Sequence, residues 1–226
     1  MNVLQYLKVI RKTFLTPLKA RCSYSQCAED LIAEQYFLGS DLKDELKFYV
    51  DVGSHHPKRG SNTFRLYKKK WKGILVDMEE DKVLSAKLAR PRDKVVKAAV
   101  SDKIEKVQIY SPKAFSTNAT VSKLNPNLDQ SYKLIDTVIT ESLDMILAKY
   151  KCPSKFGFLS IDIEGNDYKA LCGLSLDLFT PKLICIENFR AEQGIDELLK
   201  SEIHYHLRKN SYKLTGWTGP STFYTK

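Results

Sequence analysis

The sequence predicts an α/β fold with a doubly wound, mostly parallel sheet. Short apolar runs alternate with helical segments, as in repeated strand–helix units. Ligands of such sheets bind at the carboxyl ends of the strands, so polar residues at several strand ends predict a functional cleft. Four apolar runs end in acids or small polar residues, and an acid follows a fifth: Asp51, Asp77, Ser101 with Asp102, Asp162, and then Glu187.

Length and composition fit one globular domain with a short appendage. The chain has 226 residues, of which 43% are hydrophobic and 28% charged. We predict a basic amphipathic N-terminal extension over residues 1–22 and an α/β domain over residues 23–226. No apolar run approaches the ~20 residues of a membrane-spanning helix. Basic residues interrupt the apolar start, so it does not resemble a signal peptide.

Cysteine usage and charge narrow the classes of function. The five cysteines are an odd number without a C-x-x-C pair, which favours neither a disulfide framework nor a zinc site, and we predict a cytoplasmic protein. The net charge is +9, but most lysines are dispersed. The densest group, Lys68–Lys70 with Lys72, lies at a predicted helix end, where it complements the helix dipole. There is no clear nucleic-acid signature.

Two helices are predicted before the first strand. Residues 3–18 carry apolar residues at helical spacing with lysine and arginine elsewhere, which predicts an amphipathic basic helix. It either packs on the domain or lies on the inner face of an anionic membrane. Residues 25–37 form the second helix, with Ser25 as a plausible N-cap and acids in its first turns.

The remaining elements alternate. Residues 183–186 are entirely apolar, and residues 158–161 are apolar except for Ser160, as in buried parallel strands. Pro91 ends the helix predicted over 81–88. Residues 106–110 and 133–139 alternate like strands, and 114–132 are polar, which indicates a loop. The other predicted strands are 48–52, 74–77, 95–100, 212–214 and 222–224, and the helices are 62–70, 81–88, 141–150, 168–174 and 195–209.

The turn after the first strand favours a cofactor without a pyrophosphate. Only Gly53 and Gly60 are present, so neither the G-x-G-x-x-G pattern nor a Walker loop occurs. An acid before a single glycine, as in Asp51-Val-Gly53, fits S-adenosylmethionine, whose ammonium favours a nearby carboxylate. An ordinary strand-to-helix turn is the alternative. Asp77, at the tip of the second strand, is placed to accept hydrogen bonds from a ribose.

Several motifs in order resemble one family. They are SQCAED (25–30), FYVDVGSHHP (48–57), SNT (61–63), WKGILVDMEE (71–80), RPRDKVVKAAVSD (90–102), ESLD (141–144), FLSIDIEGNDYKALCG (158–173) and LICIEN (183–188). From about residue 23 onward the chain resembles the FkbM-type S-adenosylmethionine-dependent methyltransferases. The resemblance implies a class I methyltransferase (Rossmann-like) fold and, usually, O-methylation of sugars or natural products. The family usually has Glu-Pro where this chain has Asp77-Met78.

The resemblance and the strand ends together suggest a cofactor site. The turn after the first strand would surround the methionine portion of the cofactor. The end of the second strand would hold the ribose, and the end of the third strand would flank the adenine. Gln26 and Asp30 would close the site from the helix predicted over 25–37. The predicted cofactor-binding residues are Gln26, Asp30, Asp51, Gly53, Ser54, Asp77, Met78, Ala99, Val100, Ser101 and Asp162.

Methyl transfer to a hydroxyl requires a base, and the candidates are Asp162, Glu164, His55 and His56. Asp162 and Glu164 lie two residues apart, so one strand-like face can present both. With Glu187 they provide oxygen ligands for Mg²⁺, a cofactor that the sequence leaves open. The alternative is a structural role for these residues. Glu164 or Glu187 would then be held by backbone amides or by a lysine, and His55 or His56 would pack on the turn.

We therefore expect O-methylation of a hydroxyl on a sugar, a glycan or a related small molecule. An RNA methyltransferase and a non-catalytic binding module are the alternatives. The [DNS]-P-P-[YFW] motif of base amino-group methylation is absent after the fourth strand, where the chain reads Asp162-Ile-Glu-Gly. Intact Asp51, Gly53 and Asp77 argue against a non-catalytic module. Acceptor selection is expected in residues 112–132 and 188–195.

Overall fold

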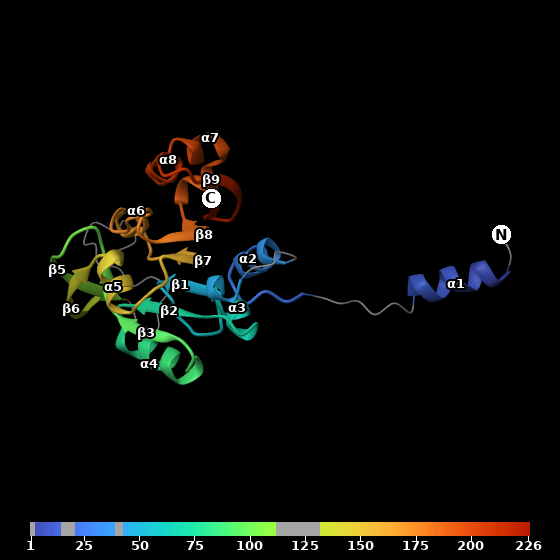
Figure 1. Ribbon diagram of the computed structural model, residues 1–226, viewed down its shortest axis with the longest axis horizontal. Coiled ribbons are helices and arrows are strands. Elements are labelled where there is room, and N and C mark those ends of the chain that lie inside the picture. Colours follow the sequence, from blue (N-terminus) through green and yellow to red (C-terminus); the bar gives the residue numbers. More distant parts are fainter. Residues whose placement is uncertain (1–2, 15–20, 39–42, 112–131) are drawn as a thin grey trace.

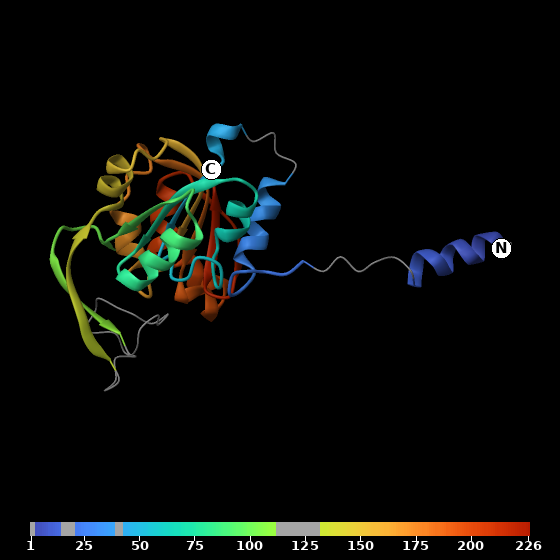
Figure 2. The same cartoon turned by 90° about the horizontal axis from the view of Figure 1, so that it is seen from below.

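The structure is a computed structural model that describes residues 3–14, 21–38, 43–111 and 132–226. It confirms an α/β fold built around a mostly parallel sheet. Figures 1 and 2 show a layered body, with helix α1 (Val3–Phe14) lying apart from it. Within the described ranges, no helix has the length and apolar character that crossing a bilayer requires.

The main sheet has seven strands in the order β3-β2-β1-β7-β8-β10-β9. The first five strands of this order pair in parallel, and β10 pairs antiparallel with both β8 and β9. The order reverses beside β1, so the crevice between the carboxyl ends of β1 and β7 is where such a sheet binds its ligand. The strands are β1 (Phe48–Val52), β2 (Lys72–Asp77), β3 (Lys94–Lys97), β7 (Lys155–Ile161), β8 (Thr180–Glu187), β9 (Lys213–Thr218) and β10 (Ser221–Thr225).

Helices cover both faces of this sheet because neighbouring strand residues point to opposite faces. Val50 of β1 belongs to a core cluster with residues of α5, α6 and α8, while Tyr49 belongs to a cluster with residues of α2, α3 and α4. The helices are α2 (Glu29–Phe37), α3 (Phe64–Lys68), α4 (Glu80–Ala89), α5 (Leu143–Lys149), α6 (Asp167–Cys172), α7 (Ile195–Leu199) and α8 (Glu202–Lys209), with 3-10 turns η1 (Asp44–Leu46) and η2 (Phe189–Gln193).

The predicted strand over 95–100 is wrong as a single element. The chain leaves the main sheet at Ala98, whose N–H donates to the Asp77 carbonyl (3.0 Å). After it, β4 (Ala99–Val100) pairs with β6 (Lys133–Glu141), which also pairs with β5 (Lys106–Ser111) in a second, three-stranded sheet. Figure 2 shows β5 and β6 extending beyond the body. The predicted loop over 114–132 lies, except for its last residue, outside the described residues.

The predicted helices also differ at their ends. The helix predicted over 195–209 is two helices, because Ser201 starts α8 by accepting the His204 N–H on its hydroxyl (3.1 Å). Helix α2 begins only at Glu29, after Ala28 in a left-handed conformation (φ 69°). Ser25 is therefore not its N-cap, although its hydroxyl accepts the Asp30 N–H (3.1 Å).

Candidate active site

A pocket lies where the carboxyl ends of β1, β2 and β7 meet, at the predicted crevice. Nine of the predicted site residues line it: Gln26, Gly53, His55, Asp77, Met78, Ala99, Val100, Asp162 and Glu164. The remaining lining residues are Val52, Gly60, Val76, Lys82, Ala98, Ile163 and Asn166. Segments from five regions of the sequence thus converge on one hollow.

Packing within the protein also requires glycine at position 53, in addition to the approach of a ligand. Its φ of 82° is a left-handed conformation that favours glycine. A Cβ at this position would lie 1.8 Å from the carbonyl oxygen of Asp162. The glycine therefore lets the turn after β1 pack directly on the backbone after β7, which closes the floor of the pocket.

Asp77 is held by the turn that follows β1. Its carboxylate accepts the His55 N–H (2.8 Å) and the Glu79 N–H (3.0 Å). Burial raises the pKa of Asp77, and Lys82 and these amides oppose the rise. Because a carboxylate has about four lone-pair sites, Asp77 keeps acceptor capacity toward the pocket.

Asp51 does not line the pocket, in contrast to its predicted place beside the methionine portion. Its carboxylate accepts the hydroxyl proton of Thr63 (2.5 Å), and Arg90 donates to the same hydroxyl (3.0 Å). Burial raises the pKa of Asp51, and the positive charge of Arg90 opposes the rise. The side chain is therefore committed to a buried network behind the turn.

Asp162 and Glu164 both line the pocket, but not from one strand-like face, because β7 ends at Ile161 and Glu164 lies in a turn. Burial raises the pKa of Glu164 to about 7, aided by the charge of Asp162 and opposed by Lys82. Burial and the negative charges of Asp167 and Asp51 raise the pKa of Asp162. Glu164 has a left-handed backbone (φ 57°). A strained carboxyl that titrates near neutrality marks a functional position.

Asp167 holds the loop that carries both carboxyls, a role that the sequence reasoning missed. It is buried and accepts the N–H groups of Ile163 (2.9 Å) and Gly165 (3.0 Å). Burial raises its pKa to about 6. Asp167 thus accepts two amides of the loop, which is the role that the alternative gave to Glu164 or Glu187. An acid in the first turn of the helix after the loop was the available signal.

The two histidines differ. His55 lines the pocket, and its buried Nδ1 has no hydrogen-bond partner among the described residues. Burial lowers its pKa to about 4, aided by Lys82 and His56. His56 does not line the pocket; its Nδ1 accepts the N–H groups of Lys58 (3.1 Å) and Arg59 (2.9 Å) and shapes the turn. His56 therefore matches the alternative of a packed histidine.

Three further predicted residues are buried outside the pocket. Asp30 accepts the Ser23 hydroxyl (2.6 Å) and the Tyr24 N–H (2.9 Å), so it is committed to the segment before α2. Ser54 and Ser101 are also buried and do not line the pocket. Of the two residues predicted to close the site near α2, Gln26 alone lines it.

Lys82 is a pocket residue that the sequence reasoning missed. It lies in α4, is 5% exposed, and forms an ion pair with Glu79 (2.5 Å). Its position in the first turn of the helix predicted over 81–88, directly after the strand end at Asp77, was the available signal. Lys82 places a positive charge among carboxyls, where it opposes the raised pKa values of Asp77 and Glu164.

The predicted Mg²⁺ ligands do not form a metal site. Glu187 is buried, its Oε2 has no hydrogen-bond partner in the described part of the chain, and burial and the charge of Asp162 raise its pKa. In residues 3–14, 21–38, 43–111 and 132–226, no group of three or more His, Cys, Asp or Glu side chains is arranged to hold a metal. The structure therefore gives no support for Mg²⁺ at Asp162, Glu164 and Glu187.

Comparisons with known proteins identify the family to which the chain belongs. Two solved structures resemble the chain: an O-methyltransferase from Bacillus cereus in complex with SAH (12% identity, TM-score 0.46, covering 99% of this chain and 90% of that one) and a putative caffeoyl-CoA O-methyltransferase from Staphylococcus aureus (9%, 0.41, 100% and 93%). No curated protein matches. The family model described as the Methyltransferase FkbM domain matches residues 51–214. The chain belongs to this methyltransferase family.

Proposed function

We propose that the protein transfers a methyl group from S-adenosylmethionine to a hydroxyl of a sugar, a glycan or a related small molecule. One observation carries the proposal. The pocket at the strand-order reversal brings the glycine turn after β1, the acid Asp77 and the carboxyls of Asp162 and Glu164 into one hollow. The family match supports methyl transfer, and the pocket supports a nucleoside cofactor.

The lining residues suit the parts of the cofactor. Asp77 would accept hydrogen bonds from the ribose hydroxyls, and Ala99 and Val100 would lie against the adenine. The methionine portion would lie over Gly53, and Asp162 would attract its ammonium. Asp51 supports the turn after β1 through its buried network, and we assign it no contact with the cofactor.

We assign the base to Glu164. S-adenosylmethionine would supply the methyl group: an oxygen lone pair of the acceptor would attack the methyl carbon as the carbon–sulfur bond breaks, leaving S-adenosylhomocysteine. The hydroxyl proton passes to the Glu164 carboxylate, whose pKa of about 7 places it near the working pH. The pKa of His55, about 4, makes its imidazole a much weaker base.

The first test is a calorimetric titration of the purified protein with S-adenosylhomocysteine. Saturable one-to-one binding is expected. An acceptor screen beginning with glycans, with and without added Mg²⁺, would follow. No binding by a protein shown to be folded would refute the cofactor assignment and would bring the non-catalytic module forward.

RNA methylation is a second candidate because of a basic groove. The groove lies at the amino ends of the strands, at the other end of the sheet from the pocket, so it does not extend the pocket. Salt-sensitive RNA binding would favour this candidate, and its absence would disfavour it. The groove is lined by Lys43, Asp44, Leu46, Lys47, Phe48, Lys72, Gly73, Arg92, Lys94, Lys151, Pro153, Ser154 and Lys155.

The cytoplasmic location also stays a proposal. All five cysteines are free thiols in the structure. A reducing compartment suits such a protein. Fractionation of cells that express the full chain would test it.

A further inference from the structure

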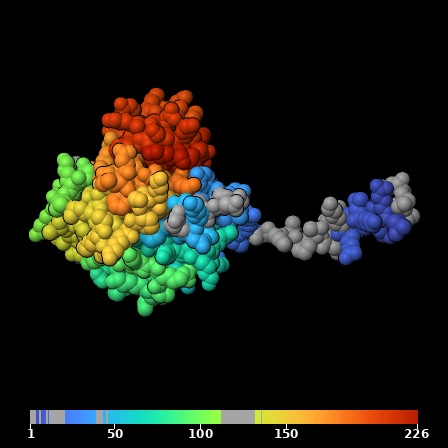
Figure 3. All heavy atoms as spheres, in the orientation of Figure 1, coloured from blue at the N-terminus to red at the C-terminus, as the bar shows by residue number. Residues whose placement is uncertain are grey.

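Helix α1 presents apolar side chains to solvent. Leu4, Leu7 and Val9 are 70%, 54% and 53% exposed. Figure 3 shows α1 standing outside the packed body of the protein. A helix with this much uncovered apolar surface needs another surface to cover it.

The charge around α1 indicates the kind of surface. Residues 1–22 contain five lysine and arginine residues and no aspartate or glutamate, which is more than half of the net charge of +9. Lys8 and Arg11 of α1 are both exposed. Helices with an apolar stripe and a lysine- and arginine-rich side bind in the interface of anionic bilayers.

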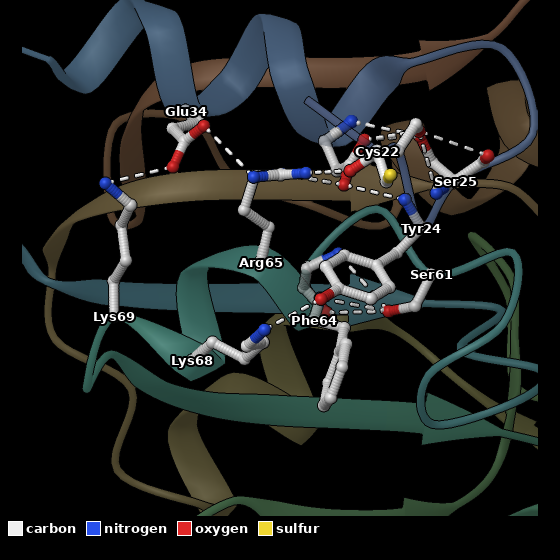
Figure 4. A network of polar contacts seen from close by, with 12 residues as sticks. Cys22, Tyr24, Ser25, Glu34, Ser61, Phe64, Arg65, Lys68 and Lys69 are labelled. Carbon is white, nitrogen blue, oxygen red and sulfur yellow. Dashed lines mark hydrogen bonds and ion pairs between the residues drawn. The ribbon is translucent and has the colours of Figure 1, made fainter. Parts of the chain in front are cut away.

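The segment Arg21–Gln26, which precedes α2, is fixed to the body, as Figure 4 shows for Cys22, Tyr24 and Ser25. Arg65 of α3 donates to the carbonyl of Cys22 and to the carboxylate of Asp30 (3.0 Å). Lys68 donates to the Tyr24 hydroxyl (2.8 Å). These contacts join the segment to α2 and α3.

The same segment leads directly to the pocket. The Gly60 N–H donates to the Tyr24 carbonyl (2.7 Å), and both Gly60 and Gln26 line the pocket. Between Phe14 and Arg21 the chain can span at most about 25 Å. A surface that holds α1 therefore keeps Arg21, where the segment leading to the pocket begins, within about 25 Å of the end of α1.

We propose that α1 binds the interface of an anionic lipid bilayer and that the segment Arg21–Gln26 holds the pocket beside that membrane. Lys8 and Arg11 contact the lipid headgroups, and the neighbouring apolar side chains of Leu4 and Leu7 enter the boundary of the acyl chains. Acceptors carried on the membrane then lie within reach of the pocket. The docking itself does not depend on the reaction that the pocket catalyses.

The experiment is co-sedimentation of the full-length protein with vesicles. We expect binding to vesicles of phosphatidylcholine mixed with phosphatidylglycerol, little binding to phosphatidylcholine alone, and weaker binding as salt is raised. The double variant Lys8→Glu with Arg11→Glu should bind at least about tenfold more weakly, since each basic residue near an anionic surface contributes to binding. Leu4→Asp with Leu7→Asp should lose binding even at low salt.

Two matched controls locate the contact. Leu88→Asp changes an 86% exposed leucine on α4, and Lys43→Glu with Lys151→Glu reverses charge in the basic groove. Both should bind like the unchanged protein. Equal binding by the α1 variants, loss of binding in the groove variant alone, or no preference for anionic vesicles would each overturn the proposal. The α1 variants should still bind S-adenosylhomocysteine, which separates failure here from failure of the proposed function.

Discussion

The two ends of the seven-stranded sheet carry opposite charges in different surroundings. At the amino ends lie exposed lysines, and at the carboxyl ends lie acids that are buried or half-buried. The amino-end lysines that begin strands are Lys72 of β2, Lys94 of β3 and Lys155 of β7. The carboxyl-end acids are Asp77 at the end of β2, Asp162 after β7 and Glu187 at the end of β8.

Burial, more than charge, distinguishes these two ends. An exposed lysine is screened by water and contributes little energy to the fold. A buried carboxyl has a raised pKa and must be held by amides or a cation, as Asp77 is by the His55 and Glu79 amides. The carboxyl end is therefore the end where chemistry is expected, and five predictions test this difference.

Glu164→Gln should have the largest effect, on turnover. Loss of a general base lowers the rate by about 10²–10⁴-fold. In the unchanged protein, kcat/KM should rise with pH through about 7, the pKa of Glu164, and then level off. Rate measurements across pH with an identified acceptor check both. A variant that keeps full activity would remove Glu164 from the mechanism.

Gly53→Ala should come next, with a loss of about 2–5 kcal/mol in the free energy of unfolding. The added Cβ would meet the Asp162 carbonyl at 1.8 Å, in a left-handed conformation that alanine disfavours. Gly60→Ala is the matched control, since its φ is 71° and nothing lies within 4 Å. It should lose only about 1–2 kcal/mol. Urea denaturation checks both, and equal losses would contradict the packing argument.

Asp77→Ala should weaken S-adenosylhomocysteine binding by about 1–3 kcal/mol through lost hydrogen bonds to the ribose. Calorimetry measures this affinity. Asp81→Ala removes an exposed acid four positions away and should leave the affinity unchanged. If Asp77→Ala also binds normally, the ribose assignment is wrong.

Glu164→Gln should also change the pH dependence of stability. The folded-state pKa of Glu164 is raised from 4.5 to about 7, so between these values the folded protein binds more protons than the unfolded chain. Stability therefore falls as pH rises through this window. Glutamine cannot ionise, so at pH 8 the variant should be roughly 1–2 kcal/mol more stable, after allowance for screening by solvent. Denaturation at pH 4.5 and pH 8 checks this, with Glu192→Gln at an exposed acid as the control.

Lys72→Glu with Lys155→Glu should have the smallest effect. Both lysines are exposed, so we expect a stability change within about 0.5 kcal/mol and unchanged S-adenosylhomocysteine affinity. Thermal denaturation and calorimetry check the pair. A large loss of affinity would show that the two ends of the sheet are coupled.

Prediction of the elements succeeded where the signal was local. The apolar runs before Asp77 and Asp162 are strands of the main sheet, and their polar ends lie at one pocket. The prediction failed where pairing with residues distant in the chain decides to which sheet a segment belongs. Residues 95–100 are apolar enough for one strand, but pairing of Ala99 with Thr140 takes the chain into a second sheet after Ala98.

The site residues also fall into those that sequence position predicts and those that only the tertiary structure places. Asp51 and Asp162 both lie at strand ends, so their sequence positions make them equal candidates for the pocket. The structure separates them, because Thr63 and Arg90 engage Asp51 from behind the turn while Asp162 lines the hollow. Sequence spacing alone carries no information about such partners.

The sequence by itself determined the α/β class, the strand ends at which acids gather, and the glycine turn after β1, because strand alternation and turn chemistry are local properties of the chain. The tertiary structure alone decided which acids face the pocket, that Lys82 joins them, and that Glu164 titrates near neutrality. The reason is physical. Burial and charge–charge interactions depend on neighbours brought together by packing, such as Lys82 and Glu164, which are far apart along the chain.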